Sequence, residues 1–168
     1  MAAARVLIVG GGYVGMYTAL GLQKRLSRGA AEITVVEPQS NMTYQPFLPE
    51  AAAGSVEPRH VVVSLRRVLR RCDVITGAVT RLTHAEKTAM IQPSDGEAYE
   101  FGYDILIMCP GSISRLLQIP GLADRGIGFK TIGEAIYLRN HVLSRIDLAA
   151  STSDRRRRAS ALTFVFVG

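Results

Sequence analysis

Two kinds of hydrophobic pattern alternate along this chain. Apolar-rich runs of the kind found in buried parallel strands occupy residues 5–9, 32–36, 104–108 and 162–167. Residues 17–26 instead carry apolar side chains at helical spacing. The same period recurs in residues 131–150, which open with a capping box from Thr131 to Glu134. Strands that alternate with helices predict an α/β fold built on a parallel sheet.

The middle of the chain changes to short strands separated by turn signals. These strands are predicted at residues 73–76, 78–83, 89–91 and 99–101. The run Pro93-Ser94-Asp95-Gly96 is a strong turn signal between the last two. This spacing predicts an antiparallel β-meander before the chain returns to the parallel sheet at residues 104–108. Residues 151–160 are polar and rich in arginine, and are predicted to form a loop.

Composition and cysteine usage limit the classes of protein to which this chain can belong. The chain has 168 residues, which suits about one domain, and a net charge of +6. Its two cysteines, Cys72 and Cys109, lie in unrelated contexts, so we expect no disulfide framework and no metal site. Such cysteine usage indicates a reducing compartment. No apolar run approaches the roughly 18–20 residues that span a bilayer.

Arginines are concentrated in a few places, namely Arg66-Arg67, Arg70-Arg71 and Arg155-Arg156-Arg157-Arg158. One interpretation is an anionic partner, such as a membrane surface or nucleic acid. The other is a solvated helix face and a solvated loop. We favour solvation and expect no nucleic-acid partner, because no aromatic residues interleave with the arginines to stack bases.

The first apolar run leads directly into Gly10-Gly11-Gly12-Tyr13-Val14-Gly15, a G-x-G-x-x-G motif between a strand and a helix. In such motifs the first glycine allows a tight turn. The second, Gly12, leaves room for a pyrophosphate, and the third, Gly15, lets the helix approach the strand. The helix N-terminus then directs N–H groups and its dipole toward the phosphates.

An acidic residue follows at the expected distance. Glu37 ends the second predicted strand. Its separation from the glycine motif is close to the ~20 residues that usually lie between such a motif and its ribose-binding carboxylate. The alternative is a glycine-rich turn in another α/β protein, with an acid at the strand end by chance. The strand, the helix and Glu37 together favour dinucleotide binding.

Several segments in one order resemble a known family. They are Val9–Gly15, Glu37, Tyr44-Gln45-Pro46-Phe47-Leu48-Pro49, Gly77-Ala78-Val79-Thr80 and Tyr103–Ile107 before Gly111-Ser112. Together they are similar to the amino-terminal half of a flavoprotein of the pyridine nucleotide:disulfide reductase superfamily. Within it the chain resembles type II NADH:quinone oxidoreductases. The loop after Glu37 has no cysteine, which excludes the disulfide-reductase chemistry of this superfamily.

The resemblance implies a Rossmann-like FAD-binding domain at residues 1–112, with a parallel sheet and a β-meander. Residues 113–168 would begin a second, incomplete dinucleotide-binding domain for NAD(P)H. Gly168 would be the first glycine of a second G-x-G-x-x-G, so we expect the chain to be a portion of a longer enzyme. The implied cofactor-binding residues are Gly10, Gly12, Tyr13, Val14, Gly15, Glu37, Pro38, Gln45, Pro46, Val79, Pro110 and Gly111.

Within that set the resemblance assigns individual roles. Gly111 would approach the FAD pyrophosphate, Val79 would meet the adenine through its backbone, and Gln45-Pro46 would lie near the flavin ring. At the two positions before the glycine the family usually has Ala-Thr or Ala-Ala, whereas this chain has Cys109-Pro110 before Gly111. Pro110 lacks a backbone N–H, so a hydrogen bond donated there would be lost.

The function implied by the resemblance is FAD-dependent NADH dehydrogenation, in which hydride passes to the flavin and electrons pass to a quinone or other acceptor. No side chain stands out as a catalytic acid or base, and the isolated chain is expected to be inactive. A cytoplasmic location, peripheral membrane association and a homodimer are expected. The alternatives are a ferredoxin-reductase-like flavoprotein with a protein acceptor, and a non-catalytic FAD- or dinucleotide-binding module.

Overall fold

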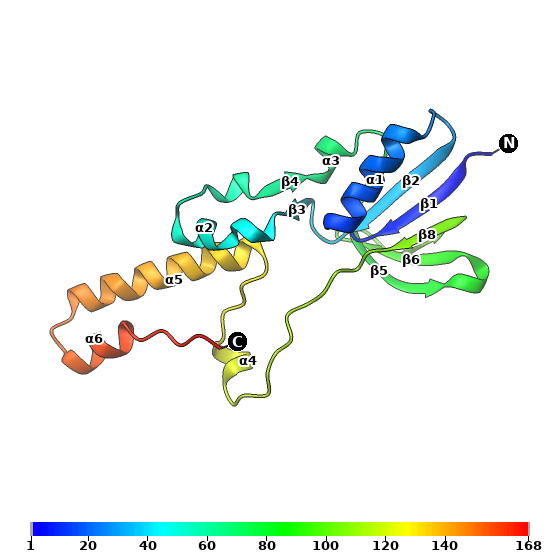
Figure 1. Ribbon diagram of the computed structural model, residues 1–168. Coiled ribbons are helices and arrows are strands. Elements are labelled where there is room, and N and C mark those ends of the chain that lie inside the picture. Colours follow the sequence, from blue (N-terminus) through cyan, green and yellow to red (C-terminus); the bar gives the residue numbers. More distant parts are fainter. Residues whose placement is uncertain (1, 168) are drawn as a thin grey trace. The chain divides into compact units, whose positions relative to one another are not determined.

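The computed structural model describes residues 2–167 and divides into two units (Figure 1). Unit 1 contains the residues up to Thr43 together with Val62–Ile113. Unit 2 contains Tyr44–Val61 together with the residues from Ser114 onward. The predicted domain boundary at residue 112 lies beside one of these divisions, but the sequence did not suggest that residues 44–61 group with the second half. Gly168, the proposed start of a second glycine motif, lies outside the described residues.

Unit 1 is built on a six-stranded sheet in the order β7-β6-β5-β2-β1-β8. The strands are β1 (Ala4–Val9), β2 (Ala31–Glu37), β5 (Asp73–Thr83), β6 (Thr88–Pro93), β7 (Tyr99–Gly102) and β8 (Ile105–Met108). The four strands β8, β1, β2 and β5 are parallel, with Val6 opposite both Ile33 and Ile105. The pairs β5–β6 and β6–β7 are antiparallel. The predicted parallel sheet with an antiparallel meander is therefore confirmed.

Strand β5 belongs to both parts of this sheet. Residues 73–76 pair with β2 in parallel, and the rest of the strand pairs with β6 in the antiparallel sense. The sequence predicted two short strands here. Gly77 lies at the junction, where a Cβ would come within 2.5 Å of the Gln92 carbonyl oxygen. A side chain at this position would force the two strands apart, so glycine allows one continuous strand.

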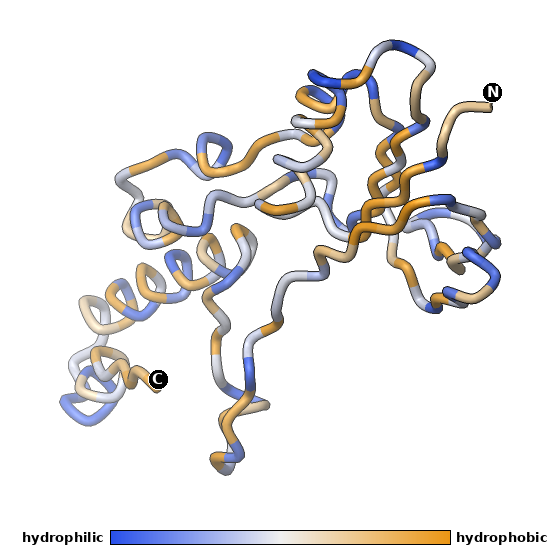
Figure 2. The backbone as a smooth tube through the Cα atoms, turned by 45° about the vertical axis from the view of Figure 1, so that its right-hand side comes forward, coloured by the Kyte–Doolittle hydropathy of each residue, from blue (hydrophilic) through white to orange (hydrophobic). Residues whose placement is uncertain are grey.

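The inner parallel strands β1 and β2 are buried on both faces of the sheet. On one face, helix α1 (Tyr13–Arg25) lies across β1 and β2 (Figure 1), with Met16 and Ala19 packed against Val6 and Ile8. The opposite face buries Leu7, Val36, Ala89, Ile91 and Tyr103. Because successive side chains of a strand point to opposite faces, the run Val6-Leu7-Ile8 contributes to both clusters. Figure 2 shows these strands as largely hydrophobic along their length.

Strand β8 differs from its prediction as a buried strand. It is parallel to β1, as expected, but the side chains of Ile105 and Met108 are 51% and 49% exposed. The reason is its place at the edge of the sheet, where it has a neighbour on one side only. Just before it, Asp104 accepts hydrogen bonds from the Arg5 backbone and guanidinium. These bonds hold the pKa of the Asp104 carboxyl below its usual value.

Smaller elements complete unit 1. Strands β3 (Asn41–Thr43) and β4 (Val62–Ser64) form an antiparallel pair, followed by the short helix α3 (Leu65–Val68). The 3-10 turn η3 (His84–Glu86) joins β5 to β6. Its His84 lies 3.2 Å from the hydroxyl of the buried Tyr103, which gives that hydroxyl a polar partner.

Unit 2 is helical. It contains two 3-10 turns and four helices: η1 (Gln45–Phe47), α2 (Leu48–Ala53), η2 (Pro58–His60), α4 (Leu122–Arg125), α5 (Ile132–Ser151) and α6 (Arg155–Ala161). Helices α2 and α5 pack through Leu48, Ala51 and Ala135. The predicted capping box is present, since Thr131 accepts from the Glu134 backbone and Glu134 accepts from that of Thr131. The backbone N–H of Lys130 also donates to Glu134 Oε2, and this bond, together with those from the Thr131 backbone and hydroxyl, holds the pKa of Glu134 below its usual value.

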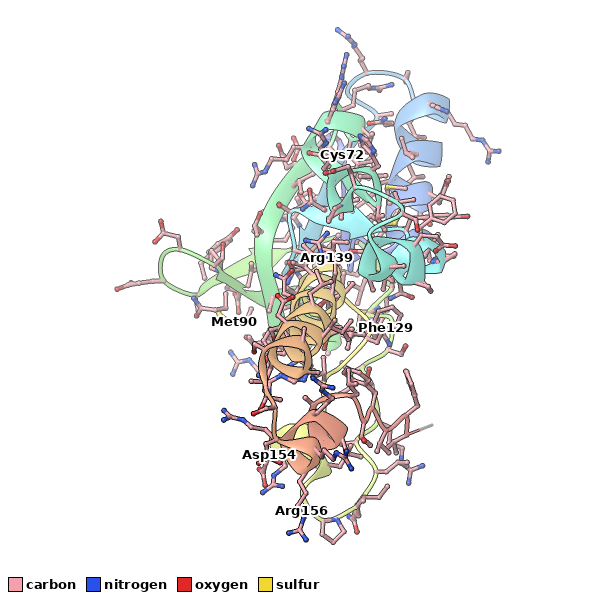
Figure 3. All side chains as sticks on the ribbon, turned by 90° about the vertical axis from the view of Figure 1, so that its left-hand side faces the viewer. Cys72, Met90, Phe129, Arg139, Asp154 and Arg156 are labelled. Carbon is pink, nitrogen blue, oxygen red and sulfur yellow. The ribbon has the colours of Figure 1, made fainter. Side chains whose placement is uncertain are left out.

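Two predictions for the end of the chain are wrong. The arginine-rich stretch is not a loop, because residues 155–161 form helix α6. Asp154 caps that helix by accepting hydrogen bonds from the backbones of Arg156 and Arg157. Arginine has good helix propensity, and a polar run after an N-cap can form a helix. Figure 3 shows the Arg156 side chain pointing away from the ribbon.

The apolar run at residues 162–167 has no strand conformation in the structure. Phe166, for example, is 93% exposed. A strand requires a neighbour for its backbone N–H and C=O groups. The described part of unit 2 contains no strand that could pair with this run. Within residues 2–167, each helix is too short or too polar to span a bilayer.

Candidate functional site

The glycine loop between β1 and α1 has a separate reason for glycine at each end. Gly10 has a φ of +102°, and a Cβ there would collide with the carbonyl of Cys109 at the end of β8. A Cβ on Gly15 would collide with the carbonyl oxygen of Gly10. These two glycines therefore permit the tight turn and the close packing of α1 against the loop, as the motif predicts.

Gly12 is different, because a Cβ at this position would meet nothing within 4 Å. The residue is exposed and is the N-cap of α1. No side chain caps this end of the helix, and its first turn contains no acidic residue. The fold therefore does not itself require glycine here. The space beside Gly12 and the positive end of the α1 dipole suit an anion that approaches the backbone closely.

Glu37 lies beside this loop. One of its carboxylate oxygens, Oε2, accepts a hydrogen bond from the Gly11 N–H at 2.6 Å. The other, Oε1, accepts from the Gln39 N–H at 3.2 Å. A second bond ties the loop to β2, from the Gly10 N–H to the Val36 carbonyl at 2.8 Å. The structure thus brings together the glycine motif and the acid that the sequence paired by spacing.

The end of β8 borders the same loop. The Cys109 N–H donates to the Val9 carbonyl at 2.7 Å, and the chain then passes through Pro110 to Gly111, which has a φ of +67°. Burial raises the pKa of the Cys109 thiol. The side chain packs against the α1 face of the sheet, as a small apolar residue does.

The remaining predicted residues fall in two places. Val79 lies on β5, where the register with β6 shifts between Val79 and Arg81. Gln45 and Pro46 belong to η1 of unit 2, flanked by an edge-to-face pair of Tyr44 and Phe47 with ring centroids 5.0 Å apart. Unit 1 contains all the other predicted site residues. The grouping of Gln45 and Pro46 with the glycine loop stays a prediction.

One residue at the site was missed by the sequence reasoning. Leu65, at the start of α3, is completely buried, and its Cδ1 would lie 2.6 Å from a Cβ placed on Gly11. The available signal was the glycine at position 11, which the G-x-G-x-x-G pattern does not require. A glycine at this position is compatible with crowding, but the pattern does not identify the neighbouring residue.

Over most of its length the chain is similar to a known family of proteins. The profile of the family described as pyridine nucleotide-disulphide oxidoreductase matches residues 4–157. The type II NADH:quinone oxidoreductase Ndh of Mycobacterium tuberculosis is 30% identical over 98% of this chain and 35% of its own length. The demethylphylloquinone reductase NdbB of Synechocystis is 28% identical over 83% of this chain and 36% of its own length. The chain thus spans about a third of these relatives.

Solved structures agree on the fold. The structure of NDH2 from Plasmodium falciparum in complex with NADH superposes with a TM-score of 0.83 at 19% identity, over 92% of this chain and 32% of that one. The sulfide:quinone oxidoreductase of Aquifex aeolicus superposes with a TM-score of 0.75 at 19% identity, over 86% of this chain and 33% of that one. The predicted resemblance is confirmed by these comparisons.

Proposed function

The chain belongs to the pyridine nucleotide-disulphide oxidoreductase family, and from this we propose that it supplies the FAD-binding part of an NADH:quinone oxidoreductase. The support from relatives is that the chain matches proteins named type II NADH:quinone oxidoreductases over nearly its whole length. The observation that carries the proposal is the hydrogen bond between Gly11 and Glu37, which joins the phosphate loop to the ribose-binding acid.

The described residues fit the ADP half of FAD. Its pyrophosphate is an anion that needs close access to backbone N–H groups, and the open side of Gly12 at the uncapped end of α1 offers such access. The adenosine ribose presents two neighbouring hydroxyl groups as donors. A carboxylate has about four acceptor positions, and backbone N–H groups use two on Glu37. Two therefore remain for the hydroxyls.

Other residues receive roles under this proposal. Gly111 would meet the pyrophosphate, Val79 would meet the adenine, and Gln45 with Pro46 would lie near the flavin ring. Tyr13, Val14, Pro38 and Pro110 complete the proposed set as residues that flank the bound cofactor. Pro110 contributes shape alone, because it has no N–H to donate.

The bound flavin would supply the redox chemistry, accepting hydride from NADH and passing electrons to the quinone. The contribution of this chain is to bind and orient the ADP half of the cofactor. Two of its histidines serve other purposes, since His84 contacts the Tyr103 hydroxyl and His141 stacks on Tyr137. We therefore assign no catalytic acid or base to the described residues.

The remaining parts of the proposal concern the whole enzyme. Residues 113–168 would begin an NAD(P)H-binding domain. Quinones are apolar and reside in membranes, which supports peripheral association at the inner face of the cell membrane. The homodimer stays a prediction from the family resemblance.

The test is direct titration of the purified chain with FAD, followed by flavin fluorescence, and with ADP as competitor. We expect saturable binding of one FAD that ADP displaces. NADH oxidation with a soluble quinone should be absent from the isolated chain, because the chain spans about a third of the length of the quinone oxidoreductases that it matches. If the chain binds neither FAD nor ADP, the proposed function is contradicted. Steady NADH oxidation by this chain alone would contradict the assignment of the second domain.

A further inference from the structure

Gly11 is enclosed by two side chains that come from distant parts of unit 1. A Cβ on Gly11 would lie 2.6 Å from Leu65 Cδ1, 3.0 Å from Glu37 Cβ and 3.1 Å from Glu37 Cγ. Leu65 is fully buried within the core on the α1 side of the sheet, so it has little freedom to move away. The methylene groups of Glu37 therefore lie against Gly11, which Leu65 also contacts.

The need for glycine at this position is one of space. The glycines with positive φ in this chain include Gly10 and Gly111, and Gly11 is not among them. Alanine could therefore adopt the backbone conformation of Gly11. Its methyl group would instead collide with Leu65 or press on the stem of Glu37. The same residue donates its N–H to the Glu37 carboxylate at 2.6 Å, a short charge-assisted bond.

The N–H of Gly11 and the crowding around its Cα thus both act on the Glu37 side chain. The Gly11 N–H donates to Glu37 Oε2, and the absence of a Cβ at Gly11 leaves room for both the Glu37 stem and Leu65. A carboxylate held in this way keeps its two remaining acceptor positions in a fixed direction before any ligand arrives. Such preorganisation improves affinity because less side-chain entropy is lost on binding.

We propose that Gly11 and Leu65 are positioning residues that set the affinity of the site for the adenosine ribose, by holding Glu37 in place. This inference rests on the proposed function, since it presumes that the ADP half of FAD binds at the glycine loop. It adds a determinant outside the three glycines of the motif and outside the acid itself. The residue at the variable second position of the motif acts through Glu37, and Leu65 supports both.

The experiment measures the dissociation constant for FAD by flavin fluorescence in variants of the full chain. Gly11→Ala should raise this constant about tenfold or more, the scale expected from losing a bond to a charged group. The matched control is Gly21→Ala on α1, where a Cβ meets nothing within 4 Å. The control should bind FAD as the wild type does, and far-UV circular dichroism should show that both variants are folded.

Two double variants test whether the effect passes through the named residues. On a Glu37→Ala background, Gly11→Ala should change the constant by less than about twofold, because coupled positions are not additive. In Gly11→Ala/Leu65→Val the terminal methyl that obstructs the new Cβ is gone. This variant should bind FAD about as well as Leu65→Val alone, and it serves as the test if Gly11→Ala alone does not fold.

The outcomes separate the two proposals. If the wild-type chain binds neither FAD nor ADP, the proposed function is wrong and the inference is overturned with it. If the wild type binds but Gly11→Ala binds equally well, the inference alone is wrong. It is also overturned if the Gly11→Ala and Glu37→Ala effects add fully, or if a folded Gly11→Ala/Leu65→Val variant binds FAD more weakly than Leu65→Val alone.

Discussion

The two units of this chain bury their apolar residues to very different extents. In unit 1 the sheet is covered on both faces by clusters centred on Ile8 and Leu7. In unit 2 the buried cluster is small and consists of Leu48, Ala51, Val61 and Ala135. Many large apolar side chains of unit 2 are instead exposed. They include Leu116, Leu117, Ile119, Tyr137, Leu143, Ile146, Val165 and Phe166.

This difference determines how far each unit can hold a binding site in place by itself. Unit 1 closes its own core, so the positions of its glycine loop and Glu37 are fixed by packing and by hydrogen bonds. Unit 2 has apolar surface in helical and strand patterns that suit burial, yet the described residues leave much of it exposed. We therefore place the cofactor-binding proposal on unit 1. The predictions below test that division.

The largest effect is expected from a side chain at Gly15. Gly15→Val would drive a branched side chain into the Gly10 carbonyl and separate α1 from the loop. We expect unit 1 to lose about 4 kcal/mol or more of stability, measured by urea unfolding. Gly21→Val on the same helix has open space around its Cβ and should leave the fold intact. If both variants were equally stable, the packing role of Gly15 would be wrong.

A side chain at Gly12 should leave the fold intact and abolish cofactor binding. Gly12→Val adds its bulk to open space, so the circular dichroism spectrum and the unfolding midpoint should stay close to those of the wild type. The new side chain would occupy the approach of the pyrophosphate, and we expect FAD affinity to fall about 100-fold or more, the equivalent of about 2.7 kcal/mol. Undiminished flavin binding by this variant would refute the assignment of Gly12.

Removal of the acid should weaken binding by an intermediate amount. Glu37→Ala loses the acceptors for the ribose hydroxyls, and the expected cost is about 1.5–3 kcal/mol, the scale of hydrogen bonds to a charged group. The loss should appear with FAD and with ADP but not with FMN, which lacks the adenosine half. An equal loss for FMN would show that Glu37 supports the fold instead of contacting the ribose.

The smallest effect is expected in unit 2. Thr131→Ala removes the side-chain acceptor of the α5 capping box and should cost about 1 kcal/mol. Because the buried cluster of unit 2 is small, this loss should be visible as faster amide exchange in the first turns of α5. FAD binding by unit 1 should not change. A change in FAD affinity would show that α5 contributes to the cofactor site.

Local patterns predicted most of unit 1. The strand–glycine–helix sequence, the turn at Pro93–Gly96 and the position of Glu37 each rest on residues close together in the chain, and each is confirmed as structure. The contact of Leu65 with Gly11 could not be predicted in the same way. It joins residues far apart in sequence, and no periodic pattern encodes which buried leucine reaches a loop.

The errors in the sequence predictions have identifiable physical causes. The polarity of residues 151–160 favours a loop, while the helix over residues 155–161 depends on arginine propensity and on the Asp154 cap. Strand β8 has the composition of a central strand, but the order of strands places it at an edge. A hydrophobic run indicates a tendency to be buried, and the topology decides whether a neighbour is present to bury it.

The central claim is that FAD binds at the glycine loop of unit 1, and hydrogen exchange with and without FAD tests it most directly. Bound FAD should slow exchange of the backbone amides of residues 10–16, Glu37 and Gln39, because phosphate and ribose contacts would cover that surface. Peptides from residues 131–151 should exchange at unchanged rates. Saturable FAD binding that leaves residues 10–16 unprotected, or that protects unit 2 alone, would contradict the account.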